Sequence, residues 1–101
     1  MSLHRLFVYG TLLEGSIQEL VIGRRITGEP AVLAGFRRTT TLQSGGAYPI
    51  LVEDADATPV EGQILEVTDE ELARLDEYEG DAYRRLQVTV ESGAECWVYT
   101  K

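Results

Sequence analysis

Residues 68–80, TDEELARLDEYEG, decide the fold of this chain, because they form the longest helix signal in a sequence otherwise dominated by strand patterns. Thr68 and Glu71 have the spacing of a capping box, in which each side chain accepts a hydrogen bond from the other residue's backbone amide. Gly80 stands where such a helix would end. We therefore predict a helix from Thr68 to Gly80.

A helical wheel over this segment places one carboxylate on the apolar side. At roughly 100° per residue, Glu79 falls between Leu72 and Leu75, and Asp76 lies at the margin of the same face. The opposite, solvent side is assigned four charged residues: Glu70, Glu71, Arg74 and Glu77. A carboxylate directed at the core must be paired or protonated, because burial of its isolated charge is costly. Burial and the negative end of the helix dipole would both raise the pKa of Glu79 towards the range useful for proton transfer.

Two other arrangements of Glu79 stay open on the sequence alone. In the first, its side chain turns outward at a frayed end of the helix. In the second, it forms an ion pair with Arg84 or Arg85, which follow closely in the chain. Either arrangement would leave the carboxylate without a catalytic role.

The remaining elements are mostly strands. Runs of aromatic, aliphatic and β-branched residues between turn signals predict six of them: Arg5 to Tyr9, Ala31 to Thr41, Tyr48 to Glu53, Val60 to Val67, Tyr83 to Val90 and Glu95 to Thr100. A short second helix is expected from Ser16, as its cap, to Gly23. Strands that are grouped, and do not alternate strictly with helices, favour an α+β fold over a doubly wound parallel sheet. Six short strands in so small a chain are expected to curl towards a barrel, because closure removes exposed edges.

Length and composition limit the class of protein. The chain has 101 residues, 17 acidic and 9 basic side chains, and a net charge of −8. This size and a hydrophobic content of 44% predict one globular domain over residues 1–101. The acidic balance argues against nucleic acid and anionic membranes as partners, because both are bound through cationic side chains. Twelve of the 17 acids lie in residues 53–81, which contain a single basic residue.

The expected cellular compartment follows from what the sequence lacks. No apolar run approaches the roughly 20 residues needed to span a bilayer, and the first residues have no secretory signal pattern. The single Cys96 cannot form an intramolecular disulfide and is expected to be a structural core or edge residue. We therefore expect a cytoplasmic protein.

Three familiar motifs are incomplete. Residues 10–15 have the glycine spacing of a phosphate-binding loop, but the Lys that the motif requires is absent. Residues 54–65 open like a calcium loop, yet Pro59 and Leu65 replace its glycine and its bidentate Glu. One His and one Cys are too few for a His/Cys zinc site, and a Ser-His-Asp triad would depend on His4 near the N-terminus. The sequence therefore predicts no nucleotide-binding loop and no metal site.

Several short motifs, taken together and in order, resemble a known family. They are residues 7–12 (FVYGTL) at the end of the first strand, Tyr48-Pro49, residues 60–62 (VEG), residues 75–80 (LDEYEG) followed by Tyr83 and Arg85, and Val98-Tyr99 in the last strand. This combination is similar to the γ-glutamylcyclotransferase-like family, which includes the AIG2-like proteins and the γ-glutamylamine cyclotransferases. The resemblance implies a small mixed barrel-like sheet with flanking helices, and a pocket formed by the YGTL loop and the Glu of the EG pair.

By that resemblance Glu79 is the catalytic residue, which agrees with the helical wheel. In the family this Glu takes a proton from the substrate α-amine, which attacks its own γ-carbonyl to give 5-oxoproline and a released amine or amino acid. The implied partner is a small γ-glutamyl substrate, and the reaction needs no metal or other cofactor. Arg85 is expected to brace a carboxylate or the sheet surface, and Asp76 to support Glu79. The candidate substrate-binding residues are of two kinds. Gly10, Thr11 and Leu12 offer backbone amides to the developing oxyanion, and Tyr9 and Tyr83 offer aromatic rings to the pocket wall.

Three classes of function follow from these features. The ordered motifs favour a cyclotransferase. The second class is a binding module of the same fold that holds a small carboxylate or amine without turnover. The third is a structural or interaction protein, and it predicts that no pocket surrounds Glu79.

Overall fold

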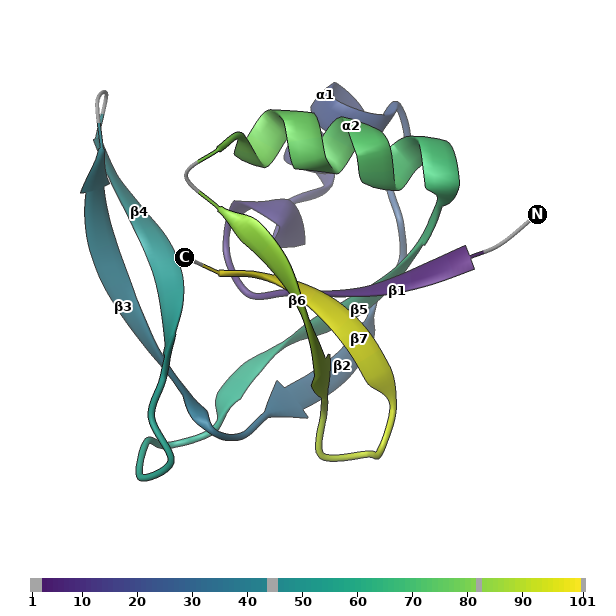
Figure 1. Cartoon of the computed structure of the whole chain (residues 1–101). Coiled ribbons are helices and arrows are strands. Elements are labelled where there is room, and N and C mark those ends of the chain that lie inside the picture. The colour runs from purple at the N-terminus through teal and green to yellow at the C-terminus, as the bar shows by residue number, and fades with distance from the viewer. Residues whose placement is uncertain (1–2, 44–45, 82, 101) are drawn as a thin grey trace.

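Figure 1 shows the computed structural model, which describes residues 3–43, 46–81 and 83–100. In chain order its elements are β1 (Leu3–Val8), the 3₁₀ turn η1 (Thr11–Leu13), α1 (Gly15–Ile22), β2 (Glu29–Leu33), β3 (Phe36–Gln43), β4 (Gly46–Glu53), β5 (Val60–Thr68), α2 (Asp69–Glu79), β6 (Arg84–Thr89) and β7 (Glu95–Thr100). Five strands form a mixed sheet in the order β2-β5-β1-β7-β6, and β3 and β4 form a separate hairpin. Both helices lie on one side of the sheet (Figure 1). The α+β class is therefore confirmed.

The central strand β1 leads the chain to the middle of the molecule. It pairs with β5 in antiparallel fashion and with β7 in parallel. Near its end it is also buried on both faces, because apolar side chains pack above and below it, and Leu6, Phe7 and Val8 expose at most 3% of their surface. The chain therefore leaves the sheet from a rigid, fully packed strand.

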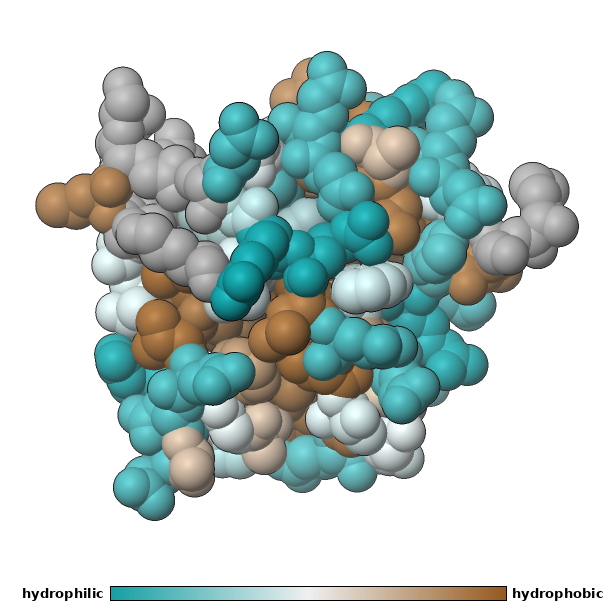
Figure 2. Space-filling model, viewed as in Figure 1, coloured by the Kyte–Doolittle hydropathy of each residue, from teal (hydrophilic) through white to brown (hydrophobic). Residues whose placement is uncertain are grey.

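Apolar clusters cover both faces of the sheet. Alternation along β1 sends Phe7 into a cluster shared with Leu51 of the hairpin, and Leu6 into a cluster shared with Leu72 of α2. The hairpin is also tied to the sheet by Thr100, whose hydroxyl donates to the Leu51 carbonyl at 2.7 Å. In Figure 2, apolar atoms remain visible between the hairpin and β6, while hydrophilic side chains gather over α2.

The strand predictions need two corrections. The run from Ala31 to Thr41 is two strands, β2 and β3, because the chain turns a corner at Gly35, whose φ is +87°. Glycine takes that conformation at no steric cost, and the corner moves the chain out of the sheet into the hairpin. The expected curling does not produce a closed barrel: in the described part of the chain, β2 and β6 are the edges of the sheet, and the hairpin is separate.

The helix predictions are confirmed at three of four ends. α1 ends at Gly23, with φ of +82°, but it begins at Gly15, so Ser16 lies inside the helix and is not its cap. α2 has the predicted capping box: the Glu71 amide donates to the Thr68 hydroxyl at 3.2 Å, and the Thr68 amide donates to the Glu71 carboxylate at 2.9 Å. No helix among the described residues is long and apolar enough to cross a membrane.

The prediction that Glu71 faces solvent is wrong. Glu71 is only 8% exposed, because Arg24, which follows α1, reaches across to it. The Arg24 Nε donates to Oε2 at 2.6 Å and its Nη2 donates to Oε1 at 2.8 Å. These hydrogen bonds, together with that from the Thr68 amide, outweigh burial and lower the pKa of Glu71 to about 2. The start of α2 thus holds a fully paired carboxylate.

Candidate active site

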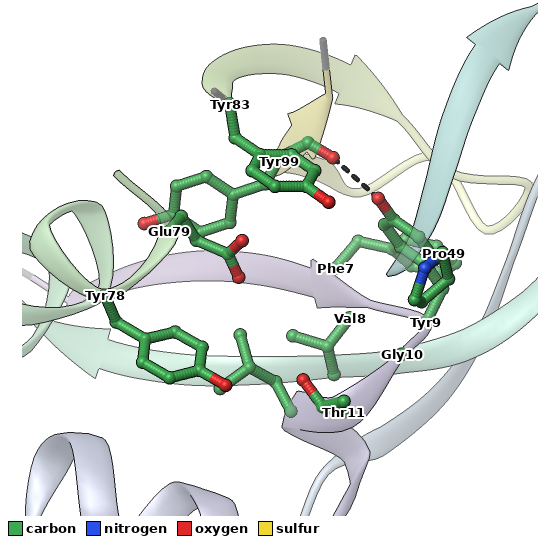
Figure 3. Close-up of a pocket in the computed structure, with 11 residues that line it drawn as sticks. Phe7, Val8, Tyr9, Gly10, Thr11, Pro49, Tyr78, Glu79, Tyr83 and Tyr99 are labelled. Atoms are coloured by element: carbon green, nitrogen blue, oxygen red, sulfur yellow. Dashed lines mark hydrogen bonds between the residues drawn. The ribbon is translucent and has the colours of Figure 1, made fainter. Parts of the chain in front are cut away.

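A pocket of about 260 Å³ lies where β1 ends, between the last turn of α2 and the hairpin (Figure 3). Ligand pockets usually measure roughly 300–1,000 Å³, so this one suits a small molecule. The lining is mostly aromatic and aliphatic, with four tyrosines and one carboxylate. Its residues are Phe7, Val8, Tyr9, Gly10, Thr11, Leu12, Pro49, Tyr78, Glu79, Tyr83 and Tyr99. Within the described residues, Glu79 is the one charged side chain of this lining.

The segment that follows β1 forms one wall of the pocket. Gly10 has to be small, because a Cβ there would lie 2.9 Å from the Pro49 Cγ of the hairpin. The chain then enters η1, where the Leu13 amide donates to the Gly10 carbonyl at 3.0 Å. The buried Gln18 side chain of α1 donates to the Leu12 carbonyl at 2.8 Å. These contacts hold the segment between the hairpin and α1.

Glu79 is the last residue of α2, and its carboxylate points into the pocket (Figure 3). Burial raises the pKa of Glu79 to about 7. The helix stops immediately afterwards, because Gly80 has φ of +73°, and its amide donates to the Asp76 carbonyl at 3.0 Å. Neither alternative from the sequence holds. The side chain does not turn outward, Arg85 pairs with Asp76, and among the described residues no ion pair joins Arg84 to Glu79.

The tyrosines surround Glu79 in different ways. The Tyr9 hydroxyl donates to the Tyr99 carbonyl at 2.9 Å, and the Tyr99 hydroxyl donates to Asp76 Oδ1 at 2.8 Å. Tyr83 extends over the pocket, and Tyr78 lies on its other side (Figure 3). Burial raises the pKa of Tyr9 and of Tyr99 well above the ordinary value, and the Glu79 carboxylate adds to the rise. Both phenols therefore stay protonated and act as hydrogen-bond donors.

The structure brings all the candidate site residues from the sequence to this one pocket. They come from three separate segments: Tyr9, Gly10, Thr11 and Leu12 after β1, Glu79 at the end of α2, and Tyr83 before β6. Sequence reasoning did not single out the five other lining residues, Phe7, Val8, Pro49, Tyr78 and Tyr99. All five stand inside the quoted motifs, which were the only sequence signal that could have identified them. The prediction of the interaction-protein hypothesis, that no pocket surrounds Glu79, is wrong.

The chemistry available to the pocket follows from its groups. A carboxyl group with a pKa near 7 exchanges its proton readily at neutral pH, which is what a general acid or base requires. Amides and phenols around it can hold a polar ligand in a fixed orientation. In residues 3–43, 46–81 and 83–100, no group of three or more His, Cys, Asp or Glu side chains is arranged to hold a metal ion.

Comparison with known proteins supplies the family. The family model described as gamma-glutamyl cyclotransferase, AIG2-like, matches residues 6–101. Protein AIG2 C of Arabidopsis thaliana is 36% identical over 88 residues, which cover 86% of this chain and 52% of that protein. A protein of Halalkalibacterium halodurans named putative gamma-glutamylcyclotransferase is 35% identical over 63 residues, covering 55% of this chain and 57% of that protein. The chain thus spans about half the length of the curated relatives that it matches.

Solved structures share the fold. A solution structure of an Arabidopsis thaliana protein superposes with a TM-score of 0.83 at 31% identity, covering 99% of this chain and 69% of that chain. A structure described as a gamma-glutamyl cyclotransferase has a TM-score of 0.78 at 18% identity, covering 98% of this chain and 66% of that chain, and it shows the fold alone. With the family model matching from the first strand to the last, the chain belongs to the AIG2-like gamma-glutamyl cyclotransferase family.

Proposed function

We propose that this protein cyclises a small γ-glutamyl compound, a γ-glutamyl amine or a γ-glutamyl amino acid, to 5-oxoproline and a free amine or amino acid. The observation that carries the proposal is the Glu79 carboxyl group, which is the one charged side chain of the described pocket lining. Burial raises the pKa of this carboxyl group to about 7. The family and the relative named putative gamma-glutamylcyclotransferase support the reaction class.

In the proposed reaction, Glu79 is the general base and then the general acid. Its carboxylate takes a proton from the substrate α-amine as the amine nitrogen bonds to the γ-carbonyl carbon and closes a five-membered ring. The same proton passes to the leaving nitrogen as the original γ-amide bond breaks. The two products together contain the atoms of the substrate, so no co-reactant is needed. The ring closure is intramolecular, and the pocket has to hold the glutamyl chain in a bent conformation.

The other lining residues have proposed roles in binding. The backbone amides of Gly10, Thr11 and Leu12 stabilise the negative charge that develops on the γ-carbonyl oxygen. The Tyr9 hydroxyl is already bonded to the Tyr99 carbonyl, so we assign Tyr9 to the pocket wall through its ring. Tyr83, which extends over the pocket, covers the bound substrate.

The test is release of 5-oxoproline from a panel of γ-glutamyl amines and γ-glutamyl amino acids. General acid–base catalysis contributes about 10²–10⁴-fold, so Glu79→Gln is expected to lower turnover by that factor. Glu77→Gln is the matched control, because Glu77 lies exposed on the same helix, and its turnover should equal that of the wild type.

Two outcomes would overturn the proposal. Full turnover by Glu79→Gln would remove Glu79 from the reaction. Tight binding of a γ-glutamyl compound without any product, unaffected by Glu79→Gln, would identify a binding module of the same fold.

A further inference from the structure

A second carboxylate on α2, Asp76, lies one helical turn before Glu79 and joins the helix to two strands. Arg85 of β6 donates to it with both arms of its guanidinium, from Nε to Oδ1 at 2.7 Å and from Nη2 to Oδ2 at 3.0 Å. Tyr99 of β7 donates its hydroxyl hydrogen to the same Oδ1 at 2.8 Å. We refer to Asp76, Arg85 and Tyr99 as the Asp76 brace.

The partners of Asp76 are themselves held in place. Arg85 and Tyr99 lie opposite each other in the antiparallel pairing of β6 with β7. The Arg85 guanidinium lies 4.7 Å from the centre of the Trp97 ring, within the range of a cation–π contact. The Tyr99 carbonyl accepts the hydrogen bond from Tyr9. The brace therefore connects α2 to a rigid part of the sheet.

The brace acts next to the pocket. Residues three apart on a helix project from the same face, so fixing Asp76 also fixes the direction in which Glu79 leaves the helix. Tyr99 belongs to the brace through its hydroxyl and lines the pocket beside Glu79 through its ring. The last turn of α2 would otherwise be free to fray, as helix ends do.

The charges within the brace compensate each other. An unpaired Asp76 would repel a negative charge on Glu79, one turn away, but Arg85 neutralises it through two hydrogen bonds. In agreement, burial is what raises the pKa of Glu79. Four tyrosines are the other titratable residues of the described pocket lining: Tyr9 after β1, Tyr83 before β6, Tyr99 of β7 and Tyr78 of the same helix as Glu79.

We propose that Asp76 and Arg85 are positioning residues that act through Tyr99 and the last turn of α2: they hold the Glu79 carboxyl in the pocket and shield it from a neighbouring charge. The inference rests on the proposed acid–base role of Glu79. It extends that role by assigning a task to two residues outside the pocket lining.

The test is a carbon-13 NMR titration of the Glu79 carboxyl in single variants. Arg85→Gln leaves Asp76 uncompensated, so the pKa of Glu79 should rise by about 0.5–1 unit. Asp76→Asn leaves the Arg85 cation uncompensated, so the pKa should fall by about the same amount. A purely structural role predicts a fall in both variants, because a loosened fold admits water to Glu79. Opposite signs support the brace, and a fall in both overturns it.

Arg74→Gln is the matched control. It breaks an exposed ion pair with Glu70 on the same helix, and the pKa of Glu79 should stay at the wild-type value. Should Asp76→Asn fail to fold, the Arg85→Gln variant decides alone: a rise supports the brace, whereas a fall or no change overturns it. The titration needs no substrate. Absence of 5-oxoproline release would therefore contradict the proposed function without changing the pKa shifts that test the Asp76 brace.

Tyr99→Phe separates positioning from charge, because it removes the hydroxyl link and keeps both charges. The pKa of Glu79 should stay within about 0.3 unit of the wild type, while kcat for 5-oxoproline release falls several-fold with KM nearly unchanged. An unchanged kcat would overturn the positional part of the proposal.

Discussion

Each end of α2 carries a glutamate withdrawn from solvent, Glu71 buried and Glu79 half-buried, and the two carboxyl groups have opposite properties. Glu71, at the start, accepts two hydrogen bonds from Arg24, and its pKa is lowered to about 2. Glu79, at the end, has no cation beside it among the described pocket residues, and burial raises its pKa to about 7. Burial alone therefore does not set the charge of a carboxyl group, because a cation that donates hydrogen bonds to it can lower its pKa despite burial. The ion pair of Glu71 at the start of the helix stabilises the fold, whereas Glu79 at the end can exchange a proton near neutral pH.

The largest expected effect on stability comes from breaking the paired end. Glu71→Gln should lower the free energy of unfolding at pH 7 by about 2 kcal/mol, a value reduced because the Arg24 side chain is 47% exposed. The pKa of Glu71 is depressed from 4.5, so its contribution is present above about pH 4.5 and is lost as the pH falls towards 2.

Urea unfolding at pH 7 measures this change. Glu70→Gln is the control, because Glu70 forms an exposed ion pair with Arg74, and such pairs contribute at most about 1 kcal/mol. Equal stability of the Glu71 and Glu70 variants would show that the Arg24 pair does not stabilise the fold.

The same substitution at the other end should have the opposite sign. The pKa of Glu79 is raised from 4.5 to about 7, so its charge destabilises the fold fully above about pH 7, partly between these values, and not below about pH 4.5. Glu79→Gln should therefore gain on the order of 1–2 kcal/mol at pH 8 and nothing at pH 4. Urea unfolding at both pH values, with Glu77→Gln as the control, measures the difference. A loss of stability at pH 8 would contradict the account.

A smaller effect is expected from placing a cationic side chain next to Glu79. Thr11 lines the pocket opposite Glu79 (Figure 3), and Thr11→Lys brings an ammonium group towards the carboxyl. The pKa of Glu79 should fall by about one unit, which moves it towards the behaviour of Glu71. Carbon-13 NMR titration measures the shift, and Thr11→Met supplies an uncharged side chain of similar length. Equal shifts in both variants would attribute the change to crowding.

Local patterns were enough to predict α2 and to place Glu79 on its apolar face, while an outward or ion-paired Glu79 side chain stayed open. The capping box from Thr68 to Glu71 and the stop at Gly80 depend on residues within one helix, where sequence spacing equals spatial spacing. The same holds for Glu79, whose place on the apolar face follows from Leu72 and Leu75. The pocket residues after β1 and before β6 were identified by resemblance, because no local pattern says that these segments meet.

What could not be predicted depends on contacts between distant segments. The wheel placed Glu71 in solvent because nothing near it in sequence indicates that Arg24 lies against α2. The corner at Gly35 was hidden in a continuous run of strand-forming residues, and the turn became evident only in the backbone conformation. Pro49 reaches the pocket because the hairpin leaves the sheet at that corner.

The most direct test of the central claim is the pH dependence of kcat/KM for 5-oxoproline release. This quantity reports the ionisation of the free enzyme. The account predicts that the rate rises with an apparent pKa near 7 as Glu79 loses its proton, and that this limb is absent from the residual activity of Glu79→Gln. A rate that does not change between about pH 5 and 8, or an identical limb in Glu79→Gln, would contradict the claim that the half-buried Glu79 carboxyl group is the acid–base catalyst.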